Sequence, residues 1–376
     1  MKKHLFALAL ATLLPFGVYA NVKVGVILSS TGPGASLGIP QKNTFAILPH
    51  TLGGEPVEYI IVDDATDATT AVKMARKLIV QDKVDLIIGS SVVPMSISVA
   101  GIAQELETPQ IALAPTSITP DKNLWTFSVP QPINIMMGAV VANMIEHDVK
   151  TVGYLGFADA WGEMVSAGLQ HNMDREGIKL VASERYGRVD TSVSGQVLKL
   201  IAAKPDAIVL GGSGTPGALP QGELVKRGYK GPIYHNHGVI NKDFLRIGGK
   251  SLEGAYAPTG PVMVAEQLSD SNPIKKVALE FTKTYEDEYG EGSRNAFAAY
   301  AWDAYLLADQ AIAAAVKNAK PGAPEFRATL RDALENAKEV VGTHGVYNMT
   351  PTDHTGLDQR ASTLVQVKDG QWKLVK

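Results

Sequence analysis

An alternation of short β-branched runs with amphipathic helical stretches constrains the fold of this chain more than any other feature. Seven segments read as strands, at residues 22–28, 57–62, 84–88, 110–114, 152–157, 207–210 and 233–235. Helical stretches separate them, and in one of these Ala71, Ala75, Leu78 and Ile79 fall on a single face. Strands that alternate with helices form mostly parallel sheets covered on both faces, so the sequence predicts a doubly wound α/β fold.

The length of 376 residues predicts two lobes, because about 350 residues exceed what a single core comfortably organises. The break between them is expected at Pro130-Gln131-Pro132, where two prolines favour an extended connector. Further crossings are expected near Gly260-Pro261 and residues 342–345. The predicted lobes are residues 21–131 with 261–342 and residues 132–260 with 343–376. Residues 363–367 and 371–375 read as a terminal hairpin with an Asp-Gly turn.

The first 20 residues have the pattern of a secretory signal. Lys2, Lys3 and His4 precede an apolar stretch at residues 5–14, and Val18-Tyr19-Ala20 forms a small-x-small cleavage site. The stretch is shorter than the roughly 20 residues that span a bilayer, so we expect cleavage after Ala20 and a periplasmic location. A signal anchor is the alternative.

Composition excludes several classes of protein. The chain has no cysteine, which excludes disulfides, thiolate metal sites, cysteine nucleophiles and a lipid-anchored cysteine. The net charge is −3 and positive charge is not clustered, which argues against nucleic acid as a partner. We expect a freely soluble monomer.

The loops that follow the strands are the expected binding loops, because ligands bind beyond the carboxyl ends of strands in open sheets. In Gly89-Ser90-Ser91-Val92-Val93-Pro94, proline suits the first turn of a helix, and the serine hydroxyls and free N–H groups favour an anion. Simple N-capping is the alternative. The next strand leads into Thr116-Ser117-Ile118, a polar loop between two prolines. An ordinary turn is the alternative interpretation of this loop.

Other loops leave alternatives open. Gly32, Gly34 and Gly38, with Asp63 or Asp64 after the next strand, allow a dinucleotide interpretation, against which Pro33 inside the motif argues. Trp161 either closes over a ligand or packs between lobes.

The second half of the chain adds glycine and histidine but no catalytic group. The loop with Ser213 and Gly214 lacks the second glycine of a hydrolase elbow, since Thr215 stands there. His235 and His237 would need a third ligand to hold zinc. No nucleophile with a base and an orienting acid is evident, so the loops predict a binding cleft without metal, cofactor or catalysis.

These motifs resemble the leucine/isoleucine/valine-binding family, the type I periplasmic solute-binding proteins of branched-chain amino-acid-type ABC importers. The resemblance spans nearly all of the chain after residue 20, and its motifs are Ser30-Thr31-Gly32-Pro33, Leu37-Gly38, Val62-Asp63-Asp64, Gly89-Ser90-Ser91, residues 114–120, Trp161-Gly162-Glu163, Asn236-His237-Gly238, and Tyr300 with Asp303. It implies two α/β lobes, three hinge crossings, a ligand cleft between the lobes that closes on the ligand, and docking on an inner-membrane permease with its ATPase.

Departures from the family pattern bear on the ligand. The amino-acid binders carry an acidic residue, which pairs with the ligand's ammonium, where this chain has His237. The family's ammonium-binding threonine aligns with Ile118, although a shift of one or two residues would place Thr116 there. Ser213, Leu37 and Trp161 stand where the family has tyrosines.

The departures predict a carboxylate without an α-amino group. Residues 35–40 and Ser213-Gly214-Thr215-Pro216 are similar to the subgroup that binds aromatic acids. The expected ligand is a benzoate-, hydroxybenzoate- or cinnamate-type acid or a 2-oxo acid, with a branched-chain amino acid as the alternative. A ligand sensor and an exported NADP-type oxidoreductase are the other classes that remain open.

The predicted site follows from the same loops. The carboxylate would rest on Ser90, Ser91 and Val92 and on the Thr116/Ser117 loop. The ring would lie between Leu37, Val93 and Trp161, and His237 would bond a substituent or the acid.

Overall fold

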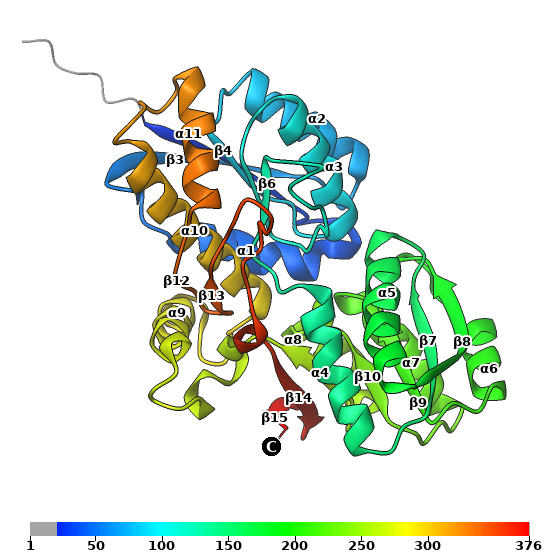
Figure 1. The fold of residues 1–376 in the computed structure, drawn as a ribbon. Helices are drawn as coiled ribbons and strands as arrows, with labels where there is room; N and C mark the ends of the chain where they lie inside the picture. The colour runs from blue at the N-terminus through cyan, green and yellow to red at the C-terminus, as the bar shows by residue number, and fades with distance from the viewer. Residues whose placement is uncertain (1–20, 376) are drawn as a thin grey trace, which may run out of the picture.

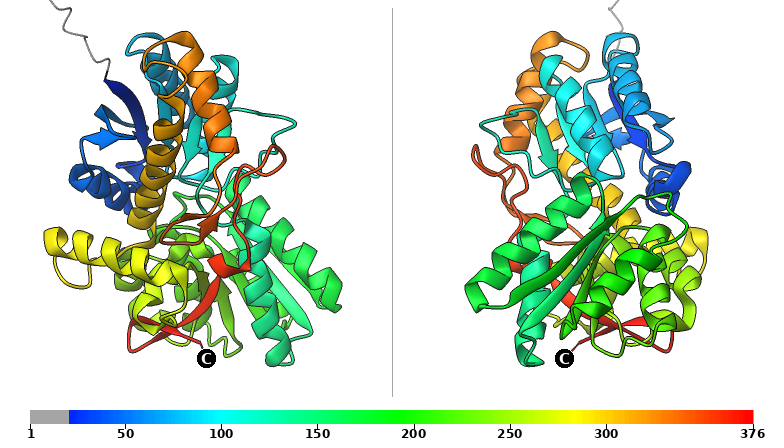
Figure 2. Two further views of the ribbon diagram at one scale, coloured as in Figure 1. Left: turned by 60° about the vertical axis from the view of Figure 1, so that its left-hand side comes forward. Right: turned by 90° about the vertical axis from the view of Figure 1, so that its right-hand side faces the viewer.

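The protein has two α/β lobes, one above the other in Figure 1, in a computed structural model that describes residues 21–375. Figure 2 shows the two lobes from two further directions. The predicted signal lies outside the described residues. Within residues 21–375, none of the helices combines the length and apolar character needed to cross a membrane.

The first lobe contains a six-stranded sheet in which all neighbouring pairs except one are parallel. Its order across the sheet is β2 (Thr51–Leu52), β3 (Glu55–Asp63), β1 (Val22–Leu28), β4 (Leu86–Gly89), β5 (Gln110–Ala112) and β6 (Thr126–Ser128). The short strand β2 pairs antiparallel with β3. Because β1 lies between β3 and β4, the strand order reverses beside β1, and the loops after β1 and β4 flank the crevice at this switch point.

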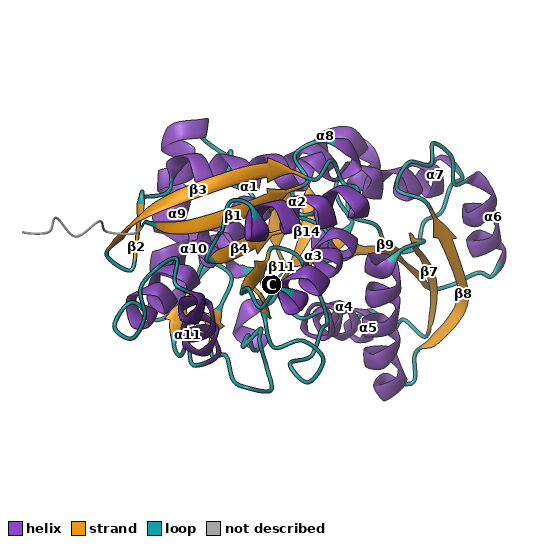
Figure 3. Ribbon diagram, turned by 90° about the horizontal axis from the view of Figure 1, so that it is seen from above, coloured by secondary structure: helices purple, strands orange, loops and turns teal. Residues whose placement is uncertain are grey.

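Helices from both halves of the sequence surround this sheet (Figure 3). They are α1 (Ala35–Ile47), α2 (Ala68–Val80), α3 (Val93–Glu105), α9 (Pro273–Tyr289), α10 (Ala296–Ala315) and α11 (Pro324–Glu335). Helix α9 packs on the outer side of α1 and α10. Helix α2 begins where the Asp67 side chain accepts a hydrogen bond from the N–H of Thr70. Its predicted apolar face, which includes Ala71 and Leu78, is buried.

The second lobe contains a seven-stranded sheet. Its order is β15 (Gln371–Leu374), β14 (Thr363–Lys368), β11 (Tyr256–Thr259), β10 (Ile233–His235), β9 (Ala207–Gly211), β7 (Thr151–Phe157) and β8 (Lys179–Tyr186). The strands from β11 to β8 are parallel, and the terminal hairpin adds two antiparallel strands. The switch point lies between β7 and β9. Asp369 and Gly370 both have positive φ, which fits the predicted Asp-Gly turn.

The helices of the second lobe are α4 (Ile133–Glu146), α5 (Ala160–Glu176), α6 (Ser194–Ala202), α7 (Leu219–Lys226) and α8 (Lys242–Gly248). A short 3-10 segment at Pro261–Gln267 follows β11 and contacts the cores of both lobes. The sequence-based prediction of two doubly wound lobes is confirmed.

Gln131 joins the three segments that link the lobes. It lies in the first connector, where its Nε2 donates to the carbonyl of Ala361 at 3.1 Å and lies 3.1 Å from Nδ1 of His344. At Gly260, in the second connector, an added Cβ would lie 1.9 Å from that same Nδ1. Tyr300 donates its hydroxyl to Oε1 of Gln131 at 2.6 Å, so this buried hub reaches helix α10.

The last crossing lies later in the chain than expected. Residues 342–345 form the turn between β12 (Val340–Val341) and β13 (Val346–Tyr347), with the N–H of Gly342 donating to the carbonyl of Gly345. Tyr347 and Leu357 pack in the core of the first lobe. The chain therefore returns to the second lobe at residues 362–363. Gly342 and Gly345, which were expected to mark the connector, form a tight turn instead.

Candidate ligand-binding cleft

The two switch points face each other across a cavity of about 330 Å³ between the lobes. The residues that line it are Leu37, Ser91, Val92, Val93, Leu113, Ala114, Pro115, Pro130, Trp161, Arg188, Ser213, His237, Gly238, Phe297 and Tyr300. Both lobes contribute, so a ligand held here would contact both lobes at once.

The first-lobe wall is built on the loop between β4 and α3. At Gly89 φ is +120°, and an added Cβ would lie 2.0 Å from the carbonyl oxygen of Ile27, so the loop requires glycine there. Ser91 accepts the N–H of Ser29 at 2.9 Å and lines the cavity together with Val92 and Val93.

Ser90 lies behind this wall and not on it. Its hydroxyl donates to Oδ2 of Asp64 at 2.5 Å, and the hydroxyl of Ser29 donates to Oδ1 of the same carboxyl at 2.7 Å. Burial raises the pKa of Asp64 despite these hydrogen bonds. Ser90 therefore supports the loop from below and does not line the cavity.

Helices α1 and α10 close the first-lobe side. The two helices pack together, which brings Leu37 of α1 beside Phe297 and Tyr300 of α10. Asn295 caps α10 by accepting the N–H groups of Phe297 and Ala298. The sequence analysis did not assign Phe297 to the site, and it noted Tyr300 only within the family pattern.

Trp161 and His237 form the second-lobe wall opposite. Asp159 caps α5 by accepting the N–H of Trp161, and the indole N–H donates to the carbonyl of Gly212 at 3.2 Å. The two rings meet edge to face with centroids 5.3 Å apart. Both ring nitrogens of His237 are buried without a partner in the described chain, and burial lowers the pKa of this imidazole to about 3. His237 is therefore neutral near pH 7.

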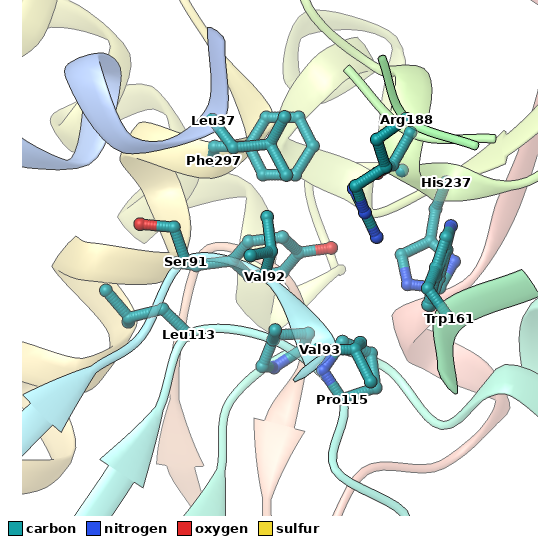
Figure 4. Close-up of a pocket in the computed structure, with 15 residues that line it drawn as sticks. Leu37, Ser91, Val92, Val93, Leu113, Pro115, Trp161, Arg188, His237 and Phe297 are labelled. Carbon is teal, nitrogen blue, oxygen red and sulfur yellow. The ribbon is translucent and has the colours of Figure 1, made fainter. Parts of the chain in front are cut away.

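Arg188 also lines the cavity and was not predicted from the sequence. It follows β8, and its Nε donates to Oδ2 of Asp159 at 2.6 Å while Nη1 donates to the hydroxyl of Ser213 at 3.0 Å. The guanidinium carbon lies 4.3 Å from the ring centroid of Phe157. Nη2 is buried and has no hydrogen-bond partner among residues 21–375. Figure 4 shows Arg188 beside His237 at one side of the cavity.

Gly214 lies where the lobes touch. Its backbone has φ +59° and ψ −157°, and an added Cβ would lie 2.8 Å from both Leu37 Cδ1 and Ser36 Oγ of the first lobe. The adjacent N–H of Thr215 donates to Ser36 Oγ at 3.3 Å. The structure therefore has the lobes in contact at this edge.

The Thr116/Ser117 loop faces a neighbouring cavity. This second space, of about 380 Å³, is also lined by Ser128, Asn134 and Thr355. It shares Pro115 and Pro130 with the cavity described above. Ile118 is absent from the lining of both.

Seven of the twelve predicted site residues thus line the central cavity, namely Leu37, Ser91, Val92, Val93, Trp161, Ser213 and His237. His235 is buried beneath them, with Nε2 2.5 Å from Oε1 of Gln221. In the part of the chain that the structure describes, no group of three or more potential ligands forms a metal site.

Comparison with known proteins identifies the family. Residues 21–371 match the sequence profile described as "Periplasmic binding protein". This chain belongs to that family. A curated relative, the Leu/Ile/Val-binding protein homolog 3 of Brucella melitensis, is 23% identical over 366 residues, which is 93% of each chain.

Solved structures agree with this periplasmic binding protein over nearly its whole length. An extracellular ligand-binding receptor from Rhodopseudomonas palustris HaA2 is 45% identical with a TM-score of 0.93, covering 95% of this chain and all of that one. The leucine-binding protein LivK from Thermotoga maritima has a TM-score of 0.81 at 23% identity, covering 94% and 98%, and shows the same fold. Because this family and the curated relatives consist of binding proteins, the protein is a binding protein and not an enzyme.

Proposed function

We propose that this protein works in the periplasm and captures a small carboxylate that lacks an α-amino group, for uptake by an ABC importer. The observation that carries the proposal is the charge of the cavity. Among the described residues that line it, Arg188 is the one charged side chain, and none is aspartate or glutamate.

This charge distribution disfavours an amino acid. The ammonium of an amino acid needs an anion when it is buried, and an uncompensated buried charge costs about 3–5 kcal/mol. His237 is neutral at pH 7 and Arg188 is positive, so neither balances an ammonium. A carboxylate, by contrast, would meet a cation.

The remaining wall favours a flat, apolar body. Leu37, Val92, Leu113 and Phe297 supply aliphatic and aromatic surface to the cavity. An aromatic acid or a short 2-oxo acid combines such a body with a carboxylate.

The mechanism proposed here is capture by lobe closure. Because a ligand in the cavity contacts both lobes, it binds the closed arrangement more tightly and shifts the equilibrium toward it. The buried hub at Gln131 contacts Tyr300, which lines the cavity, and it also contacts the segments that form the three connectors. The closed form would then dock on the permease.

A branched-chain amino acid is the second candidate. Its support comes from the curated relatives. Several of them are called Leu/Ile/Val-binding proteins and are 22–24% identical to this chain. The lining observed here offers no anion for the ammonium that those ligands carry.

A thermal-shift screen tests the proposal. A ligand present at 100 times its Kd stabilises the folded state by about 2.7 kcal/mol, which raises the melting temperature by several degrees. Benzoates, cinnamates and 2-oxo acids are compared with leucine, isoleucine and valine. The proposal expects stabilisation by one or more of the acids and none by the amino acids, and the reverse pattern would refute it.

A further inference from the structure

Three contacts hold the guanidinium of Arg188, and one of its nitrogens, Nη2, has no hydrogen-bond partner among the described residues. Asp159 accepts from Nε and Ser213 from Nη1, and the guanidinium lies over the ring of Phe157. The Asp159 carboxylate is in turn fixed at Oδ1 by the N–H groups of Trp161 and Gly162. These contacts leave the guanidinium no freedom to turn Nη2 toward another protein group.

That remaining nitrogen calls for an anionic acceptor. A guanidinium is always charged, and a buried donor without an acceptor is costly, more so when the donor is charged. Nη2 is buried without a partner among the described residues, and Arg188 lines the ligand cavity. His237, on the same wall, also has both ring nitrogens without partners, and a neutral imidazole carries one N–H donor.

The opposite wall carries no charged group. Figure 4 shows Ser91, Leu37 and Phe297 on one side of the cavity and Arg188, His237 and Trp161 on the other. The Ser91 hydroxyl accepts from the N–H of Ser29 and points away from Arg188. The unpartnered donors of the cavity therefore lie at its second-lobe end, on Arg188 and His237.

We propose that the ligand's carboxylate binds in the second lobe, on Nη2 of Arg188 and the ring N–H of His237, and that the far end of its apolar body lies at Ser91. This inference rests on the proposed function and deepens it. It reverses the orientation expected from the sequence, which placed the carboxylate on the serine loop. It also specifies the substrate class, an aromatic acid whose ring lies against the apolar first-lobe wall.

Titration calorimetry with benzoate and its neutral analogue benzamide tests the charge contact. Arg188→Gln should weaken benzoate binding by about 10- to 150-fold, the usual range for a charged hydrogen bond, and change benzamide binding less than threefold. Arg185→Gln is the matched control, because Arg185 also pairs with a carboxylate, Glu163, and lies over an aromatic ring without lining the cavity. It should leave benzoate binding unchanged. Benzoate affinity in folded Arg188→Gln within threefold of wild type would overturn the inference.

Crystals of the wild-type protein with 4-bromobenzoate give a test that needs no variant. The anomalous bromine peak should lie nearer Ser91 than Arg188, and a peak beside Arg188 would overturn the orientation while leaving the proposed function intact. Binding of amino acids but of no such acid by the wild type would overturn both.

Discussion

Gly214→Ala separates the cost of closing the lobes from the cost of folding them. The change adds one methyl group at the edge of the second lobe. In the structure that methyl carbon would lie 2.8 Å from Leu37 Cδ1 and Ser36 Oγ, whereas carbon atoms in good contact are about 3.5–4.0 Å apart. Because both atoms belong to first-lobe side chains, admitting the methyl group requires these side chains to turn aside or the lobes to move apart.

Two effects of different size and origin follow. The backbone at φ +59° and ψ −157° is a region that glycine alone adopts readily, so alanine adds about 1–3 kcal/mol of strain whether the lobes are open or closed. The overlap with the first lobe exists only on closure and costs about 1–3 kcal/mol. The strain should lower the melting temperature by about 2–4 °C per kcal/mol, and the overlap should weaken ligand binding by about 5- to 150-fold.

Thermal unfolding without ligand measures the first effect, and calorimetry with benzoate measures the second. Gly222→Ala is the control, because Gly222 lies in α7 with no atom within 4 Å of an added Cβ. It should bind benzoate as the wild type does. Benzoate affinity of Gly214→Ala within twofold of the wild type would show that this edge is not in contact in the ligand-bound state, and the closure argument would fail.

Two further predictions concern the cavity wall and pH. Trp161→Ala removes a buried ring that packs against His237. At a temperature where the variant is folded, calorimetry should show benzoate binding weakened at least about tenfold. Unchanged affinity would assign Trp161 to packing alone. Burial raises the pKa of Asp303 to about 6, above the ordinary value near 4 for aspartate, so the stabilisation from its protonated form is present below about pH 4 and is lost as pH rises through 6. In urea unfolding, the wild type should therefore lose up to about 3 kcal/mol relative to Asp303→Asn between pH 4 and pH 7, and a constant difference would contradict the assignment.

The geometry around Asp303 gives that pKa shift a structural reason. The hydroxyl of Tyr347 lies 2.8 Å from Oδ2 of Asp303 and 2.9 Å from the carbonyl of Val129, but it has one hydrogen for both. A protonated Asp303 can donate to Tyr347, which then donates to Val129. Burial of the carboxyl acts in the same direction.

Several buried strands could be predicted from the sequence, whereas the buried strands β6 and β11 and the exposed edge strand β8 were not predicted. Strands at Val22–Leu28 and Ile233–His235 match their predicted ranges, because continuous apolar runs mark strands that are buried on both faces. Strand β8 was missed because it lies at the sheet edge, where exposed and half-buried positions alternate and several residues are charged. Arg188 follows that strand, so the loop that carries it was not considered. A scan for period-two alternation through Lys179–Tyr186 would have found both.

The contribution of helix α10 could not be found by local pattern. Phe297 is 260 positions from Leu37, and only the packing of α10 on α1 brings the two together. Because α10 is buried on most of its surface, it lacks the amphipathic stripe that would indicate its cavity-facing side. The third crossing was misplaced for a similar reason, since Gly342 and Gly345 indicate a turn but not which lobe the chain enters next.

Calorimetry with matched pairs tests the central claim most directly. 3-Phenylpropanoate differs from phenylalanine, and 4-methylpentanoate from leucine, only in lacking the α-amino group. Because Arg188 is the one charged residue of the described lining and no carboxylate lines the cavity, the acid of a pair should bind at least about 100-fold more tightly than its amino acid. An amino acid that binds as tightly as its deaminated partner, or more tightly, would contradict the account.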